Sequence, residues 1–106
     1  MIYVACPYSD PDPDVVQYRM DVFADTVCQM LLNDLIPVSP LLNHFVIGDH
    51  DVPLNWQFWS KYSRTLLSKC SELHVLCVEH WDSSEGVLAE IELAKTLGLP
   101  ITYIEE

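Results

Sequence analysis

One acidic residue, Glu90, stands on a helix face that is otherwise apolar. An α-helix turns by about 100° per residue, so the neighbours of Glu90 on that face follow from spacing alone. The residues within about 60° of it on the helical wheel are Gly86, Val87, Leu93, Ala94 and Leu97. Burying an unpaired carboxylate costs several kcal/mol or forces the group to take up a proton. We therefore expect Glu90 to have either a partner or a chemical role.

Two interpretations of Glu90 stay open at this point. In the first, the carboxyl makes a structural hydrogen bond to a neighbouring strand or reaches the edge of the apolar stripe. In the second, it faces a small ligand, because Gly86 lies one turn earlier on the same face and leaves open space where a side chain would stand. The helical wheel alone does not decide between the two interpretations.

Polar segments follow two strand-like runs, at residues 6–9 and 80–84. In an open parallel sheet, ligands bind beyond the carboxyl ends of the strands, near the point where the strand order reverses. The second segment leads into a helix that we expect to begin at Asp82, with the capping box Asp82-Ser83-Ser84-Glu85. The unpaired N–H groups of such a helix start can hold a phosphate or sugar oxygen.

The elements that must position these residues alternate along the chain. Apolar runs predict strands at 2–6, 36–39, 73–78 and 100–104, and amphipathic periods predict helices over 12–34, 56–70 and 82–97. Residues 41–55 have no clear period and are predicted to form a long loop. The pattern predicts one α/β domain over residues 1–106, a flavodoxin- or Rossmann-like three-layer sandwich with a parallel sheet of four or five strands.

The charge of the chain limits its partners. Sixteen acidic residues against five basic ones give a net charge of −11. This field repels nucleic acids and anionic lipids, and no apolar run approaches the roughly 18 residues that cross a bilayer. No leader-like segment precedes the first strand-like run, so we expect a cytoplasmic location. A domain of this size has little room for a second lobe, so we expect a homodimer or larger homo-oligomer around any large cavity.

Spacing argues against a metal or redox site. The cysteines, Cys6, Cys28, Cys70 and Cys77, form no C-x-x-C motif. His44 and His50 are six residues apart, as are His74 and His80, and neither spacing puts two imidazoles on one helix face. We expect no metal and no cofactor. Trp56, Phe58 and Trp59 are predicted either to pack in the core or, as an aromatic group beside the loop, to form a base-stacking platform or lid.

Two motifs carry a resemblance to a known family. They are Ile2-Tyr3-Val4-Ala5-Cys6-Pro7-Tyr8-Ser9 and Ser84-x-Gly86-x-x-x-Glu90-x-Glu92-x-Ala94-x-x-x-Gly98-x-Pro100. Together with Val38-Ser39-Pro40, the aromatic helix start at 56–59 and the segment 70–76, they extend over nearly the whole chain. In their order and spacing they resemble the nucleoside 2-deoxyribosyltransferase superfamily, and within it a small bacterial and phage branch.

The resemblance implies a covalent mechanism. Glu90 would be the nucleophile that attacks the anomeric carbon of a 2′-deoxynucleoside, releases the base and holds a glycosyl ester. A carboxylate in that place also stabilises an oxocarbenium-like transition state, and water or a second base then resolves the ester. Tyr3 would orient the carboxylate and Tyr8 would border the base. The alternative for both tyrosines is ordinary packing.

The resemblance also implies a class of substrate. Six residues before the nucleophile, nucleotide hydrolases of the superfamily carry a serine, which Ser84 matches. Ser83, Ser84 and the helix N–H groups would bind a 5′-phosphate, with Ser9, Asp82 and Gly86 beside the substrate and Arg19 as the counter-charge. The alternatives are N-capping for the serines and a surface position for Arg19.

These observations lead to one functional expectation and two alternatives. We expect hydrolysis, or transfer, at the N-glycosidic bond of a nucleotide or nucleoside, and in particular of a 2′-deoxynucleoside 5′-monophosphate. Hydrolysis is favoured because the chain stops at Glu106 without the extension of longer transferases. Ser63 replaces an acid that faces the pocket in many relatives, so the resemblance does not extend to recognition of the base. The alternatives are a catalytically silent nucleotide-binding or protein-interaction module, and a glycohydrolase of the NAD type, which uses the same carboxylate chemistry.

Overall fold

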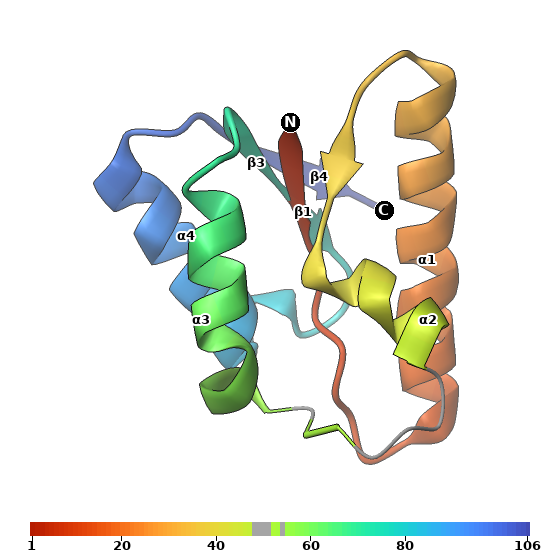
Figure 1. Cartoon of the computed structure of the whole chain (residues 1–106). Coiled ribbons are helices and arrows are strands. Elements are labelled where there is room, and N and C mark those ends of the chain that lie inside the picture. The colour runs from red at the N-terminus through yellow and green to blue at the C-terminus, as the bar shows by residue number, and fades with distance from the viewer. Residues whose placement is uncertain (48–51, 54) are drawn as a thin grey trace.

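A parallel sheet of four strands forms the centre of the molecule (Figure 1). The computed structural model describes residues 1–47, 52–53 and 55–106. Its strands are β1 (Ile2–Ala5), β2 (Pro37–Val38), β3 (Glu72–Cys77) and β4 (Ile101–Glu105), in the order β2-β1-β3-β4. Every pair is parallel, and Tyr3 lies opposite Val38 on one side and Leu73 on the other. This confirms the predicted α/β class and the parallel sheet.

Helices cover both faces of the sheet, as Figure 1 shows. Helix α1 (Pro13–Leu32) lies on one face, and α3 (Trp56–Leu67) and α4 (Glu85–Leu97) lie on the other. Successive strand residues point to opposite faces, so β1 divides its side chains between two cores. Tyr3 and Ala5 join the cluster under α3 and α4, whereas Ile2 and Val4 join the cluster under α1. None of the described helices is long and apolar enough to cross a membrane.

Two expectations about local structure were wrong. Helix α4 is capped by Ser84, whose Oγ accepts a hydrogen bond from the backbone N–H of Val87 at 3.4 Å, and not by Asp82. Residues Trp81–Ser83 form a separate 3₁₀ turn, η2, after the left-handed backbone of His80 (φ 70°). The predicted loop 41–55 contains more structure than its lack of period indicates.

The start of that predicted loop folds into two short helical segments. A 3₁₀ turn, η1 (Pro40–Asn43), is followed by α2 (His44–Ile47). The Ser39 Oγ starts the turn by accepting a hydrogen bond from the backbone N–H of Leu41 at 3.2 Å. Residue His50 of the loop lies outside the described residues.

The strand order brings two loops together. From β1 the chain moves outward to β2 on one side, and from β3 it moves outward to β4 on the other. The loops that leave the carboxyl ends of β1 and β3 are therefore neighbours at the point where the order reverses, which is where open parallel sheets bind ligands.

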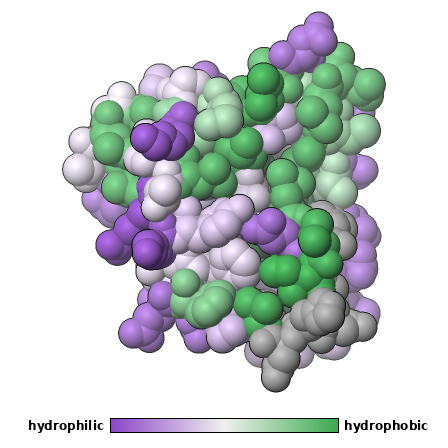
Figure 2. Space-filling model, viewed as in Figure 1, coloured by the Kyte–Doolittle hydropathy of each residue, from purple (hydrophilic) through white to green (hydrophobic). Residues whose placement is uncertain are grey.

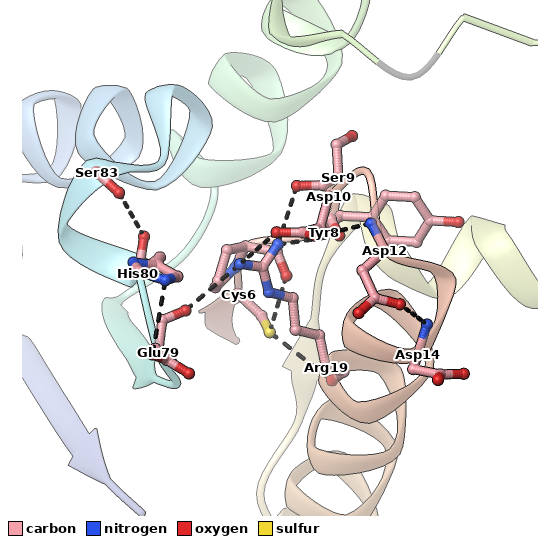
Figure 3. A network of polar contacts seen from close by, with 11 residues as sticks. Cys6, Tyr8, Ser9, Asp10, Asp12, Asp14, Arg19, Glu79, His80 and Ser83 are labelled. Carbon is pink, nitrogen blue, oxygen red and sulfur yellow. Dashed lines mark hydrogen bonds and ion pairs between the residues drawn. The ribbon is translucent and has the colours of Figure 1, made fainter.

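Arg19 ties these two loops to each other (Figure 3). Arg19 is only 4% exposed, although it belongs to the first half of α1. The guanidinium donates hydrogen bonds to the backbone carbonyls of Tyr8 (3.2 Å) and Ser9 (2.9 Å) in the first loop, and to that of Glu79 (3.4 Å) in the second. Asp10 adds an ion pair at 3.8 Å. Arg19 is thus neither a surface residue nor a free cation.

We expect Arg19→Met to lower the free energy of unfolding by about 2–4 kcal/mol, because it removes several charged hydrogen bonds between a buried side chain and the loop carbonyls. Urea denaturation measures this loss. Arg64→Met is the matched control, since Arg64 is an exposed arginine on α3 and its loss should cost less than about 0.5 kcal/mol. Equal stability of the two variants would contradict the anchoring role of Arg19.

Candidate active site

The carboxyl of Glu90 points into the protein. Helix α4 buries Val87, Ile91 and Ala94 against the sheet, and Glu90 shares their face with 8% of its surface exposed. The fully buried Tyr3 of β1 donates its phenolic O–H to the Glu90 Oε2. The inward position predicted from the helical wheel is therefore confirmed, and the carboxyl has a partner on the neighbouring strand.

Glu90 also lines a cavity of about 660 Å³. The walls come from the carboxyl end of β1, from the turn η1 with α2, and from the first turns of α3 and α4. Figure 2 shows side chains of intermediate hydropathy between α3 and α2, next to apolar side chains over α2. Tryptophan, tyrosine, serine and proline, which have such hydropathy, all contribute to the lining. The carboxyl thus satisfies both open interpretations, since it is hydrogen-bonded and faces space for a ligand.

The structure brings together some of the predicted site residues. Tyr8, Ser9, Ser84 and Gly86 line the same cavity as Glu90. Arg19, Asp82 and Ser83 do not belong to its lining. The Arg19 guanidinium is held by loop carbonyls, and Asp82 and Ser83 lie in η2, ahead of the helix start that they were expected to form.

The space opposite Gly86 is faced by an aromatic ring. A Cβ atom on Gly86 would lie 3.5 Å from Cε3 of Trp56, which is ordinary contact distance. Trp56 and Trp59 both line the cavity, whereas Phe58 is exposed and does not belong to its lining. Stacking of a base on these rings stays a prediction. The Trp59 Nε1 donates a hydrogen bond to the carbonyl of Pro53 at 2.8 Å and so attaches the adjoining chain segment to α3.

Two lining residues had no predicted role in the site. His44, at the start of α2, has its Nδ1 2.9 Å from the phenolic oxygen of Tyr8. Ser63, on α3, is 3% exposed and forms a side-chain hydrogen bond with Tyr3. The signal for Ser63 was present in the sequence, because it is one turn after Trp59 on the apolar face of the helix. His44 gave no such signal, since its helix has a single turn.

The described residues that line the cavity include no lysine and no arginine. All five lysines and arginines of the chain belong to the described part, and they are Arg19, Lys61, Arg64, Lys69 and Lys95. Arg19 is bound elsewhere and the other four are exposed. Glu85 and Glu90 are the carboxyl groups of the described lining, and no lysine or arginine there offsets the charge of a bound anion.

Burial determines the protonation of the groups in the cavity. It raises the pKa of Glu90 to about 8, although the hydrogen bond from Tyr3 lowers it. It also raises the pKa of Tyr3 far above the ordinary range, and the nearby charge of Glu90 adds to this effect. The pKa of the Cys6 thiol rises to about 12 for the same main reason. Glu90 thus ionises at lower pH than Tyr3 or Cys6.

The described residues were also compared with the arrangements of side chains that bind metal ions. In the ranges that the structure covers, no group of three or more His, Cys, Asp or Glu side chains is arranged to hold a metal ion. The cavity therefore offers a carboxyl, hydroxyls, an imidazole and aromatic rings as its chemical groups.

The raised pKa of Glu90 predicts a stability that falls with pH. The pKa is about 8 in the folded chain, and in the unfolded chain it is about 4.3. Between these values folding takes up a proton, so wild type loses about 1.4 kcal/mol per pH unit relative to a variant that cannot ionise. We expect Glu90→Gln to match wild type near pH 4 and to become steadily more stable than wild type from about pH 5 to about pH 7.5.

Urea denaturation across this pH range measures the effect. Glu92→Gln is the matched control, because Glu92 is exposed on the same helix and should show no such divergence. If the free energies of unfolding of wild type and Glu90→Gln changed in parallel with pH, this would contradict the burial of an ionisable group at Glu90.

Comparison with known proteins identifies the family of the chain. A search of curated proteins finds no match to the chain. A family model described as "Domain of unknown function (DUF1937)" matches residues 1–106, which is the whole chain. The protein therefore belongs to the DUF1937 family.

Proposed function

We propose that this protein cleaves the N-glycosidic bond of a nucleoside or nucleotide and that Glu90 is the nucleophile. The observation that carries the proposal is a buried carboxyl that is held by Tyr3 and opens on a cavity large enough for a small molecule. Such a group, once ionised, is poorly solvated and meets a developing positive charge with little competition from water. The resemblance of the two motifs to the nucleoside 2-deoxyribosyltransferase superfamily supports the same reaction.

The proposed reaction has two steps. In the first, a carboxylate oxygen of Glu90 bonds to the anomeric carbon while the bond from that carbon to the base nitrogen breaks. Tyr3 holds Oε2 by a hydrogen bond, which leaves Oε1 as the attacking oxygen. In the second step, water attacks the glycosyl ester and frees the sugar. Transfer replaces hydrolysis when a second base attacks instead of water.

The charge of the cavity favours an uncharged substrate over a monophosphate. A 5′-phosphate would find the α4 N-terminus and the Ser84 hydroxyl, which already accepts a hydrogen bond from Val87. It would also meet the carboxyl of Glu85 and no lysine or arginine. The counter-charge expected from Arg19 is absent, because loop carbonyls occupy that guanidinium. We therefore propose nucleosides as the better substrates.

A substrate panel tests the proposal. The protein is incubated with deoxynucleosides, ribonucleosides, their 5′-monophosphates and NAD, with and without an acceptor base, and free base is measured by chromatography. We expect nucleosides to release base faster than their monophosphates, and Glu90→Gln to lose at least about a thousandfold in rate. Glu92→Gln should retain wild-type rates.

Two results would contradict the proposal. Base release at an unchanged rate in Glu90→Gln would show that Glu90 is not the nucleophile. Tight nucleoside binding without any turnover would instead identify a silent binding module.

The Tyr3 hydrogen bond predicts a shift in the pH profile. Catalysis needs ionised Glu90, so kcat/KM should rise with pH through the pKa of about 8. Tyr3→Phe removes the hydrogen bond that lowers this pKa, so the midpoint of the rise should move to higher pH. Tyr103→Phe, a change at an exposed tyrosine of β4, is the control and should leave the midpoint in place. A midpoint that stays fixed or falls in Tyr3→Phe would show that Tyr3 does not act on Glu90.

A further inference from the structure

Tyr8 and His44 form a polar pair within the cavity that holds Glu90. Tyr8 follows β1 and His44 starts α2, so the pair joins segments that are 36 residues apart. The phenolic oxygen is 2.9 Å from Nδ1 of the imidazole, and the ring centroids are 5.1 Å apart with planes tilted by 58°. Both side chains are half-buried and line the cavity. The phenol thus contacts the imidazole both through a hydrogen bond and through its ring.

Cleavage of an N-glycosidic bond requires a proton donor for the leaving base, and Glu90 cannot be that donor. The electron pair of the broken bond passes to a base nitrogen, and an anionic base is a poor leaving group. A positioned acid that protonates this nitrogen typically accelerates such a step by about 10²–10⁴-fold. Glu90 must be ionised to attack, so the proton has to come from another group.

The lining offers few other donors. Burial raises the pKa of the Cys6 thiol to about 12 and raises that of the Tyr8 phenol as well, so both groups keep their protons. Glu85 is an exposed carboxyl in the first turn of α4. Imidazole is the side chain that most readily gives and takes a proton near neutral pH. His44 is the one residue of the described lining that carries an imidazole.

We propose that His44 donates the proton to the leaving base and that Tyr8 is its positioning residue. The inference rests on the proposed glycosidic cleavage and adds the second half of its chemistry. It also assigns a side of the cavity to the base, namely the side formed by α2 and the end of β1, where Leu41 and Ile47 provide apolar contacts.

The proton and electron pairs balance over the two steps. In the first, the Glu90 oxygen bonds to the anomeric carbon, the carbon–nitrogen bond breaks, and the base nitrogen takes a proton from the His44 imidazolium. In the second, the neutral imidazole accepts a proton from the attacking water. The bond between the anomeric carbon and Glu90 then breaks, and its electron pair returns to the carboxylate. Imidazolium and carboxylate are both restored.

A pair of substrates with different leaving groups tests the proposal. Unmodified purine nucleosides need a proton on the departing base. N7-methylated purine nucleosides carry a positive charge on the base, which departs without taking up a proton. We expect His44→Gln to lose at least about 100-fold in kcat/KM on the unmodified nucleoside and less than about 3-fold on the methylated one.

Two further variants complete the experiment. Tyr8→Phe keeps the ring but removes the phenolic oxygen, so it should lose about 10-fold on the unmodified nucleoside and little on the methylated one. His80→Gln is the matched control, because His80 is exposed and outside the cavity lining, and it should retain both activities. If His44→Gln does not fold, as judged by circular dichroism, Tyr8→Phe carries the same comparison.

The outcomes separate the two proposals. Equal losses on both substrates would overturn the acid role of His44, and base release by wild type would still stand. Failure of wild type to release base from either nucleoside would overturn the glycosidic cleavage and the His44 proposal with it.

Discussion

The rest of the structure depends on one buried interaction, the hydrogen bond from Tyr3 of β1 to the carboxyl of Glu90 on α4. Burial penalises the ionised carboxyl and raises its pKa to about 8, while the phenol partly offsets that penalty. Stability and reactivity therefore respond to pH in opposite directions. The protonated form suits the folded core, and the ionised form is the proposed nucleophile. Such a conflict between stability and activity is common where a functional group is kept in an apolar place.

The position of β1 at the centre of the sheet explains how the site is assembled. The strand sends Tyr3 toward α3 and α4, and its carboxyl end continues into Tyr8 and Ser9 at the cavity rim. Arg19 holds the carbonyls of those two rim residues from the α1 side of the sheet and joins them to the loop after β3. The buried guanidinium of Arg19 thus fixes, from the α1 side of the sheet, the loop that forms the rim of the Glu90 cavity. This structural task explains why a cation so close to the site is not available to a ligand.

The sequence predicted those features that depend on local periodicity. The strands, the long first helix and the inward direction of Glu90 all follow from the spacing of apolar residues. His44 was missed because η1 and α2 are too short to show a period, and because its contact with Tyr8 joins distant segments. Arg19 was misjudged because a helical wheel shows which face a side chain is on and not which loop carbonyls will meet it. The choice of Ser84 over Asp82 as the cap was also beyond local rules, since both residue types cap helices well and the left-handed turn at His80 decides between them.

The proposed chemistry makes a covalent bond, and intact-protein mass spectrometry tests for it most directly. Wild-type protein is mixed with a nucleoside that it cleaves, quenched in acid during turnover, weighed and then digested to peptides. We expect a mass increase equal to one sugar residue, carried by the peptide that contains Glu90 and absent from Glu90→Gln. Base release without any such adduct under these conditions, or an adduct on a different peptide, would contradict the nucleophilic role of this carboxyl.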